Sequence, residues 1–472
     1  MERPDTYDAI VIGSGQGGGP LAGDLARAGY RTALVERKHI GGTCINEGCT
    51  PTKTMVASAR VAYLAGRAAD YGVAARLTGV DMPAVRQRKR DIVASFRQSS
   101  TQSLKEAGVE LIFGEARFTG PKQLEVSHEG HDGRRLQAEW IFIDTGSRPV
   151  DPPLPGLDGV PHLNSTTIME LDEVPDHLLV LGGGYVGVEF GQMFRRFGSA
   201  VTIVQQGAQL LAREDADIAR AVADILEEDG ITVLLSASAQ RTARGETGGV
   251  SLDVQTSDGE RTVRGSHLLV AVGRAPNTEA LDLDRAGIEV DQRGFIKADD
   301  RLETSAPGVY ALGEVAGSPA FTHISYDDYR IIRDNLLRHG RRTRSDRLVP
   351  YTVFIDPQLG RVGAGEDELR KAGREVRIAR MPMTSVARAL EVGESRGMVK
   401  AVVDGRTDQI LGCSVLGLEG GEVMAMIEIA MMGKLPYTAL RDGIFAHPTL
   451  AELLNTLFSS LEEAPSARGE SA

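Results

Sequence analysis

A glycine-rich turn between a strand and a helix occurs twice in this chain, and it constrains the fold more than any other feature. In the first copy, the strand-like residues 7–12 lead into the turn GSGQGG at residues 13–18. A helical run follows, and a second strand over residues 32–35 ends at Glu36. Such glycines let the backbone approach a diphosphate, and the acid can accept hydrogen bonds from a ribose. The pattern predicts a dinucleotide-binding βαβ unit.

The second copy has the same order of elements. Strand-like residues 178–181 lead into GGGYVG at residues 182–187, and a helical run precedes a strand over residues 201–204. Each copy closes with a similar strand and turn, at residues 141–149 and 268–276. We therefore expect two nucleotide-binding α/β folds, of which the first is longer and contains a cysteine pair.

The cysteine pair is Cys44 and Cys49 in the run GGTCINEGCTPTK, residues 41–53. Five residues of ideal helix rise by about 7.5 Å, whereas a disulfide requires Cα atoms roughly 4.4–6.8 Å apart. We therefore expect a distorted first helical turn, which Gly48 permits. Thiolates near a helix N-terminus have a lowered pKa. With only one further cysteine, Cys413, the pattern indicates redox or metal chemistry rather than a structural disulfide framework.

Size and charge exclude several classes of protein. The 472 residues suffice for about three domains, and the formal net charge of −12 argues against nucleic acid as the main partner. No apolar run reaches the ~20 residues that span a bilayer, and the polar N-terminus shows no signal peptide pattern. We therefore expect a cytoplasmic protein with no membrane partner. The basic run at residues 86–90 is interpreted as the solvated face of a helix over residues 82–107.

The run from Gly41 to Lys53 resembles the redox helix of the class I pyridine nucleotide-disulfide oxidoreductases. That family includes dihydrolipoamide dehydrogenase, glutathione reductase and mercuric reductase, and the resemblance covers nearly the whole chain. It implies that Cys49 lies against the flavin of FAD as the charge-transfer thiol. Cys44 is then the interchange thiol that meets the acceptor, and the protein works as a homodimer.

The resemblance also implies a fold and a division into domains. The fold is α/β, with two Rossmann-like dinucleotide-binding domains and a C-terminal α+β dimerisation domain. We expect a discontinuous FAD-binding domain over residues 1–150 and 271–345, an NAD(P)-binding domain over residues 151–270 and an interface domain over residues 346–460. Residues 461–472 are expected to be disordered.

Other positions match motifs of the family beside the flavin. Lys53 and Glu189 match an ion pair at the flavin ring, where a cation favours the reduced, anionic flavin. Tyr185 matches the aromatic lid that covers the flavin until nicotinamide displaces it. Gly313 and Glu314 match the motif that binds the ribityl chain, although the family usually has Asp in place of Glu314. The extra methylene is expected to require a local backbone adjustment.

His447 and Glu452, in the run HPTLAE, match the catalytic histidine of the family and its orienting glutamate. An imidazole with a pKa of about 6.5 can shuttle the thiol proton, and a carboxylate can fix its tautomer. In the family this pair reaches the disulfide of the other subunit.

The two glycine patterns and the resemblance together give the candidate cofactor contacts. Those for FAD are Gly13, Gly15, Gly18, Glu36, Thr43, Lys53, Thr145, Gly146, Gly313 and Glu314. Those in and around the second copy are Gly182, Gly184, Tyr185, Gly187, Glu189, Gln205 and Gly273. Gln205 stands where an NAD-selective fold carries an acid, so nothing there repels a 2′-phosphate. Arg213 is the nearest candidate to bind one, and the pattern slightly favours NADPH while allowing both nucleotides.

The electron acceptor is constrained by two further stretches. Residues 321–330 and 435–445 are most similar to the mercuric reductase-like subgroup that includes a copper(II) reductase. Phe445 replaces a histidine that is usual in dihydrolipoamide dehydrogenase, and no cysteine pair follows Cys413 as in the large thioredoxin reductases. Glu47 is another departure from the family, and we hypothesise that its carboxylate raises the pKa of the cysteines or favours a cationic acceptor.

Three interpretations of the function follow. The favoured one is an NAD(P)H-dependent reductase of a soft metal ion, Hg(II) or Cu(II), which would meet the thiols transiently because soft thiolates suit soft metals. The second is dihydrolipoamide dehydrogenase or another disulfide reductase. The third is a redox or metal-stress sensor that signals through a partner; the paired His447 and Glu452 argue against it, because a sensor requires neither.

Overall fold

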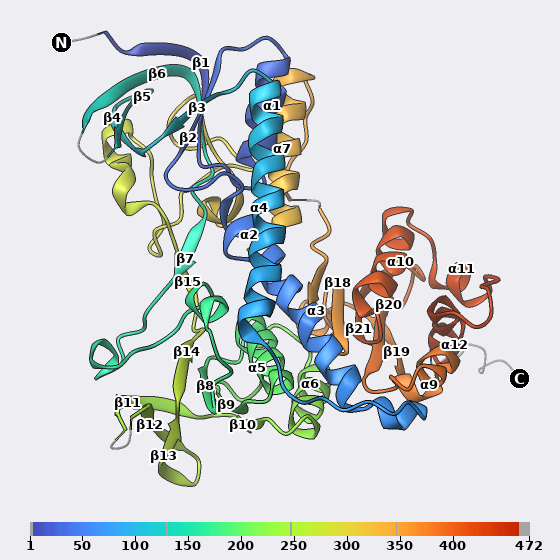
Figure 1. Cartoon of the computed structure of the whole chain (residues 1–472). Helices are drawn as coiled ribbons and strands as arrows, with labels where there is room; N and C mark the ends of the chain where they lie inside the picture. Colours follow the sequence, from blue (N-terminus) through green and yellow to red (C-terminus); the bar gives the residue numbers. More distant parts are fainter. Residues whose placement is uncertain (1–2, 129–130, 246–247, 346, 462–472) are drawn as a thin grey trace, which may run out of the picture.

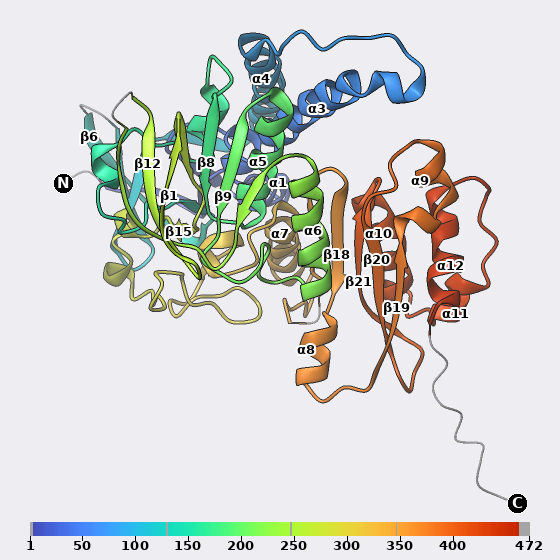
Figure 2. The ribbon, with the colours of Figure 1, turned by 90° about the horizontal axis from the view of Figure 1, so that it is seen from below.

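A computed structural model describes residues 3–128, 131–245, 248–345 and 347–461. The disordered tail expected over residues 461–472 lies, from residue 462 onward, outside the described residues. Three main sheets with their helices form the molecule, and the C-terminal one stands to one side of the other two (Figures 1 and 2).

The N-terminal sheet has the strand order β3-β2-β1-β6-β5-β4, and β16 joins it beside β6. β1 (Asp5–Ile12) lies parallel to both β2 (Thr32–Glu36) and β6 (His131–Ile143). β16 (Val309–Ala311) is also parallel to β6, so the chain returns to this sheet after the second glycine copy. The remaining strands are β3 (Glu110–Phe113), β4 (Glu115–Gly120) and β5 (Gln123–His128).

Three helices lie side by side next to this sheet (Figure 1). They are α1 (Gly18–Arg27), which connects β1 to β2, α4 (Met82–Glu106) and α7 (Thr322–Leu337). The glycine turn therefore stands between the carboxyl end of β1 and the N-terminus of α1, as the dinucleotide pattern predicts.

The basic run at residues 86–90 lies on α4. Its interpretation as the solvated face of a helix is wrong for Lys89. Lys89 is only 4% exposed and forms an ion pair with Glu170. Arg90 pairs with the same carboxylate, and Arg86 pairs with Asp172. The run attaches α4 to the segment that precedes the second sheet, which the helical spacing of the charges does not reveal.

The second sheet is entirely parallel, with the order β10-β9-β8-β14. Its strands are β8 (His177–Leu181), β9 (Ala200–Val204), β10 (Thr232–Leu234) and β14 (His267–Val270). Its helices are α5 (Tyr185–Phe197) and α6 (Ala216–Glu228), and a meander of β11 (Ser238–Arg244), β12 (Val250–Thr256) and β13 (Gly259–Gly265) adjoins it. The chain enters and leaves this unit through β7 (Ser147–Pro149) and β15 (Arg274–Pro276), which pair antiparallel.

The C-terminal sheet is antiparallel, with the order β17-β18-β21-β20-β19. Its strands are β17 (Tyr351–Val353), β18 (Gln358–Gly363), β19 (Val376–Pro382), β20 (Met398–Asp404) and β21 (Ile410–Gly417). Its helices are α8 (Glu366–Lys371), α9 (Ala387–Glu391), α10 (Gly420–Met432), α11 (Tyr437–Arg441) and α12 (Leu453–Ser459).

One buried apolar cluster joins parts of the chain that are far apart in sequence. It contains Met55 from the helix after the cysteine pair, Phe194 from α5 and Leu359 from β18. Burying a side chain of this size stabilises the fold by roughly 1.5–3 kcal/mol. The helix that begins at Cys49, here called the redox helix, is therefore fixed against both the second sheet and the C-terminal sheet.

Candidate active site

The cysteine pair lies where two helices meet at a break. α2 (Gly42–Asn46) carries Cys44, and α3 (Cys49–Gly66) begins at the second cysteine. Gly48 between the helices has φ −128° and ψ −116°, and a Cβ there would lie 2.9 Å from the carbonyl oxygen of Thr43. This break confirms the expected distortion and the need for glycine at position 48.

The two free thiols differ in acidity because they interact with each other. A hydrogen bond from Cys44 is the main reason why the pKa of Cys49 is lowered to about 6, with further help from the Thr322 hydroxyl and the positive charge of Lys53. The same hydrogen bond, together with burial, raises the pKa of Cys44. At neutral pH the pair therefore consists of a Cys49 thiolate that accepts a hydrogen bond from the Cys44 thiol.

Thr322, the first residue of α7, is a site residue that the sequence reasoning missed. Its Oγ1 lies 3.2 Å from the Sγ of Cys49. The two residues are separated by 273 positions, so only the tertiary fold shows that this hydroxyl can donate to the thiolate.

Replacing Thr322 with Val is expected to raise the pKa of Cys49 by about one unit, because a hydrogen bond to a charged group contributes about 1.5–3 kcal/mol. The thiolate fraction rises as the pH passes the pKa, so the titration of the ultraviolet thiolate absorbance would move to higher pH in the variant. Thr322→Ser, which retains the hydroxyl, serves as the control. Identical titrations of Thr322→Val and wild type would show that the hydroxyl does not stabilise the thiolate.

The ion pair of Lys53 and Glu189 that the family motif predicts is present. Nζ of Lys53, one turn after Cys49, donates to Oε2 of Glu189 at 2.6 Å. Glu189 is buried on α5, and its Oε1 accepts from the backbone N–H of Phe354 at 2.8 Å. The ion pair therefore links the redox helix to the second sheet and to the C-terminal segment.

Tyr185 is the first residue of α5, and the residue is 38% exposed. Its ring centroid lies 6.1 Å from that of Phe321, which stacks in turn on Tyr351 at 5.1 Å. Burial raises the pKa of the Tyr185 hydroxyl. The ring of Tyr185 in the wall of the cavity is thus followed by two further stacked rings that the sequence motifs did not indicate.

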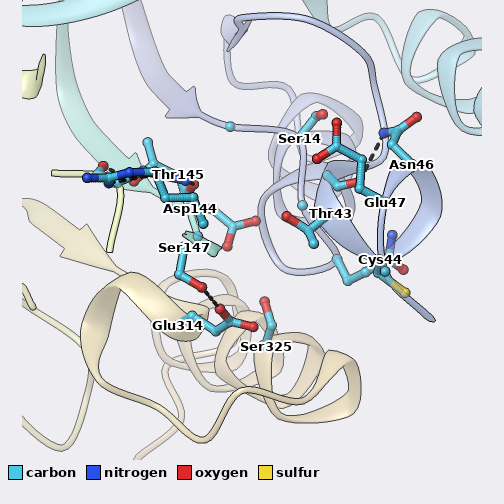
Figure 3. Close-up of a pocket in the computed structure, with 18 of the residues that line it drawn as sticks. Ser14, Thr43, Cys44, Asn46, Glu47, Asp144, Thr145, Ser147, Glu314 and Ser325 are labelled. Carbon is cyan, nitrogen blue, oxygen red and sulfur yellow. Dashed lines mark hydrogen bonds between the residues drawn. The ribbon is translucent and has the colours of Figure 1, made fainter. Parts of the chain in front are cut away.

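A cavity of about 480 Å³ connects these groups with the first glycine turn. Figure 3 shows Asp144, Thr145, Ser147 and Glu314 on one side of this cavity, and Cys44, Asn46 and Glu47 on the other. The expected FAD contacts on its wall are Gly13, Gly15, Glu36, Thr43, Lys53, Thr145, Gly146 and Glu314. Because Cys49 and Tyr185 line the same cavity, a dinucleotide bound at the turn can extend to the thiols.

The first glycine turn is shaped for a nucleotide. Ser14 donates to Oε2 of Glu36 through both its hydroxyl, at 2.6 Å, and its backbone N–H, at 3.1 Å. These bonds fix the carboxylate at the end of β2, where a ribose diol would meet it. Gly42 allows close approach, because a Cβ there would lie 2.6 Å from the Cα of Gly15. The residues present therefore fit FAD.

Glu314 lies on a short 3-10 turn, Gly313–Ala316. Its Oε2 accepts hydrogen bonds from the hydroxyl of Ser147 and from Nε of Arg274, the latter at 3.3 Å. Thr145 points elsewhere, because its hydroxyl donates to the carbonyl oxygen of Asn277 at 2.9 Å. Ser147 and Arg274 are further residues of this wall that the sequence reasoning left out.

The second glycine turn forms a hydrogen bond with the side chain of Gln205. The N–H of Gly183 donates to Oε1 of Gln205 at 2.9 Å, so the side-chain oxygen is occupied. A Cβ at Gly187 would lie 2.0 Å from the carbonyl oxygen of Gly182, which explains the requirement for this glycine. Burial is the main cause of the raised pKa of Tyr185, and the charge of Arg213 opposes this rise, so Arg213 lies within electrostatic reach of this tyrosine.

His447 and Glu452 form the expected pair. Nδ1 of His447 lies 3.0 Å from Oε1 and 3.1 Å from Oε2 of Glu452, and the N–H of Thr449 donates to the same carboxylate at 3.1 Å. The imidazole side chain is 70% exposed, and His447 is not among the residues that line the cavity with the thiols. Within one chain the structure therefore does not bring this pair to Cys44.

Comparison of the sequence with known protein families identifies the family of this chain. Residues 7–328 match the pyridine nucleotide-disulphide oxidoreductase family, and residues 349–458 match its dimerisation domain. The chain belongs to the pyridine nucleotide-disulphide oxidoreductases. As a member of this flavoprotein family it is an oxidoreductase that uses FAD and NADPH or NADH.

Relatives in the pyridine nucleotide-disulphide oxidoreductase family cover nearly the whole chain. The probable pyridine nucleotide-disulfide oxidoreductase RclA of Escherichia coli strain K12 is 40% identical over 96% of this chain and 99% of its own. The dihydrolipoyl dehydrogenase of Thermus scotoductus is 36% identical over 95% of each chain. The mercuric reductase of Streptomyces lividans is 34% identical over 95% of this chain and 94% of its own.

A solved member of the family has the same fold. The Cu(II) complex of the HOCl-induced flavoprotein disulfide reductase RclA from Escherichia coli superposes with a TM-score of 0.88 at 39% identity, covering 96% of this chain and 99% of that chain. This agreement and the two family matches confirm the expected fold of a Rossmann-like sheet with a C-terminal dimerisation domain. None of the helices in the described part of the chain is long and apolar enough to cross a bilayer.

Proposed function

We propose that the protein passes electrons from NAD(P)H through FAD to the Cys44–Cys49 pair and on to a soft metal ion, Cu(II) or Hg(II). The observation that carries this proposal is a thiolate at Cys49, with a pKa of about 6, held beside the Lys53–Glu189 ion pair. A soft thiolate is a suitable ligand for a soft metal ion. The similarity to a relative solved as its Cu(II) complex supports the metal ion as acceptor.

Each residue has a role in this proposal. When bound, FAD supplies a carrier that takes a hydride from the nicotinamide and delivers an electron pair to a disulfide. Cys49 is the thiol beside the flavin, and Cys44 is the thiol that meets the acceptor. Reduction of their disulfide takes up two electrons and two protons, and reoxidation of the dithiol returns them. Two electrons reduce one Hg(II) to the metal or two Cu(II) to Cu(I).

The arrangement in space is also part of the proposal. We assign residues 1–150 and 271–345 to FAD, residues 151–270 to NAD(P)H and residues 346–460 to dimerisation; the return of β16 to the first sheet supports the discontinuous first domain. His447 is proposed to serve Cys44 of a second copy, since its imidazole is exposed in its own chain. The compartment is proposed to be the cytoplasm.

Dihydrolipoamide dehydrogenase is the second candidate function, because a relative with this name is 36% identical.

Glu47 lies exposed between the two cysteines, and its carboxylate accepts a hydrogen bond from the hydroxyl of Thr166 at 3.4 Å. The effect of this carboxylate on a cationic acceptor stays a prediction.

Reoxidation of the reduced protein is expected to distinguish the acceptors. The full-length flavoprotein, reduced anaerobically with NADPH or NADH, should be reoxidised rapidly by Cu(II) or Hg(II) and slowly by lipoamide, as followed by flavin absorbance in a stopped-flow instrument. Cys44→Ser serves as the control, because direct metal oxidation of the flavin would persist in it. Rapid reoxidation by lipoamide alone would overturn the metal proposal in favour of the second candidate.

A further inference from the structure

A buried carboxyl group lies beneath the first glycine turn. Asp144 follows β6, where its backbone N–H donates to the carbonyl oxygen of Ile12 at 2.8 Å. Asp144 is only 7% exposed, and its Oδ2 accepts a hydrogen bond from the backbone N–H of Gly18 at 2.7 Å. Gly18 is the first residue of α1, so this carboxyl occupies an N–H of the helix end that receives a diphosphate in dinucleotide-binding folds.

Glycines from two separate turns make room for this side chain. A Cβ at Gly15 would lie 2.6 Å from Oδ2 of Asp144, and one at Gly18 would lie 2.9 Å from the same atom. A Cβ at Gly313, in the turn before α7, would lie 3.0 Å from Oδ1. Asp144 also lines the cofactor cavity, and its carboxyl group points into it in Figure 3. The carboxyl group therefore stands between the two turns that border the cofactor site.

The electrostatic surroundings of Asp144 oppose its ionisation. Burial is the main cause that raises its pKa to about 8, and the charged side chains that act on it most strongly, Asp328 and Glu314, are both acidic. Each of these acids has its own cation: Asp328 pairs with Arg347 at 2.5 Å, and Glu314 pairs with Arg274 at 3.3 Å. The backbone N–H groups of Gly18 and Gly17 donate to Asp144 and favour its ionised form, but they offset the effect of burial only in part, so at neutral pH the carboxyl group holds a proton.

We propose that Asp144 is a positioning residue that must carry its proton for tight binding of FAD at the turn of residues 13–18. In its neutral form the carboxyl group braces the turn without opposing the negatively charged diphosphate. In its ionised form it places a negative charge at the same helix end and weakens cofactor binding. Ionisation of Asp144 thus makes retention of FAD depend on pH.

The direction of the pH dependence follows from linkage. A bound diphosphate adds negative charge near Asp144 and so raises the pKa of its carboxyl group further, which means that FAD binds preferentially to the protonated protein. The affinity is then constant below a pH of about 7 and falls, by up to about tenfold per pH unit, as the pH rises above the pKa of the apoprotein.

The experiment measures FAD binding rather than turnover. The full-length apoprotein, freed of flavin, is titrated with FAD at pH values from about 6.5 to 9.5, which bracket the pKa, and the quenching of flavin fluorescence gives the dissociation constant. For wild type we expect the constant to rise steeply in the upper part of this range. For Asp144→Asn we expect tight binding at every pH, because asparagine retains an acceptor for the N–H of Gly18 and never ionises.

One further variant and two outcomes of the titration keep the proposal open to refutation. Glu314→Gln should still show a dissociation constant that rises with pH, but with the rise displaced to lower pH because one acidic neighbour of Asp144 has been neutralised. A flat profile in this variant would transfer the effect to Glu314. A wild-type dissociation constant that does not change with pH would overturn the proposal whether or not Asp144→Asn folds. Parallel profiles for Asp144→Asn and wild type would also overturn it, leaving Asp144 as a hydrogen-bond acceptor with no proton linkage.

Discussion

Replacing Cys49 with Ser is expected to lower NAD(P)H-dependent reduction of every acceptor by a factor on the order of a thousand. A hydroxyl cannot alternate between a disulfide and a thiolate, and the Cys49 Sγ is the sulfur placed against Thr322 and Lys53. Steady-state rates with Cu(II), Hg(II) and lipoamide measure the loss, and the flavin content measures whether the site remains intact.

Two variants sharpen this test. Cys44→Ser should lose transfer to the acceptor while keeping the long-wavelength absorbance of a thiolate beside the oxidised flavin, because Cys49 remains. Cys413→Ser should retain full activity, since Cys413 is buried on β21 away from the residues that line the cavity. Comparable rates for Cys49→Ser and wild type with a metal ion would show that electrons reach the metal without the disulfide.

Replacing His447 with Gln is expected to lower turnover by about 10²–10⁴, the usual contribution of a general acid–base group. Nδ1 of His447 is engaged by Glu452, which leaves Nε2 to exchange a proton with the interchange thiol. Reduction of the flavin by NAD(P)H should be unaffected, because that half-reaction precedes the proton transfer. Rapid-reaction kinetics of the two half-reactions separate the effects.

A mixture of two inactive variants shows whether the histidine acts across the dimer. Hybrids of His447→Gln with Cys44→Ser chains hold one intact site if the histidine serves the other copy, so random mixing should restore roughly a quarter of wild-type activity. If the histidine serves its own chain, every site in the hybrid is defective. A mixture that forms hybrids but stays inactive would therefore contradict the proposed role in the second copy.

Local sequence patterns predicted much of the site, because its glycines and cysteines meet backbone requirements that are set by neighbouring residues. The turn at residues 13–18, the end of β2 at Glu36 and the break at Gly48 each follow from backbone requirements that neighbouring residues reveal. The Lys53–Glu189 ion pair was also predicted, although only through a family motif. These features depend little on how the sheets pack against one another.

Other contributors could not be predicted because they depend on packing between distant segments. Thr322 reaches Cys49 only when α7 stands against the redox helix. Lys89 lies in a basic run whose sequence predicts a solvent-exposed face, and Glu170, with which it forms an ion pair, comes from a different part of the chain. Asp144 follows an apolar strand, and nothing in its neighbours indicates that its carboxyl group will be buried beneath a turn more than a hundred residues earlier.

The shared core of Met55, Phe194 and Leu359 limits how this protein can be recombined. The unit of residues 151–270, which we assign to NAD(P)H, is contiguous in sequence and joined through two short strands, so it resembles an exchangeable module. Its apolar surface, however, is fitted to one redox helix and one C-terminal sheet. A graft of the corresponding unit from a relative with different nucleotide preference would leave gaps or clashes around Phe194, and changes of specificity are better made by substitutions near Gln205 than by exchange of the whole unit.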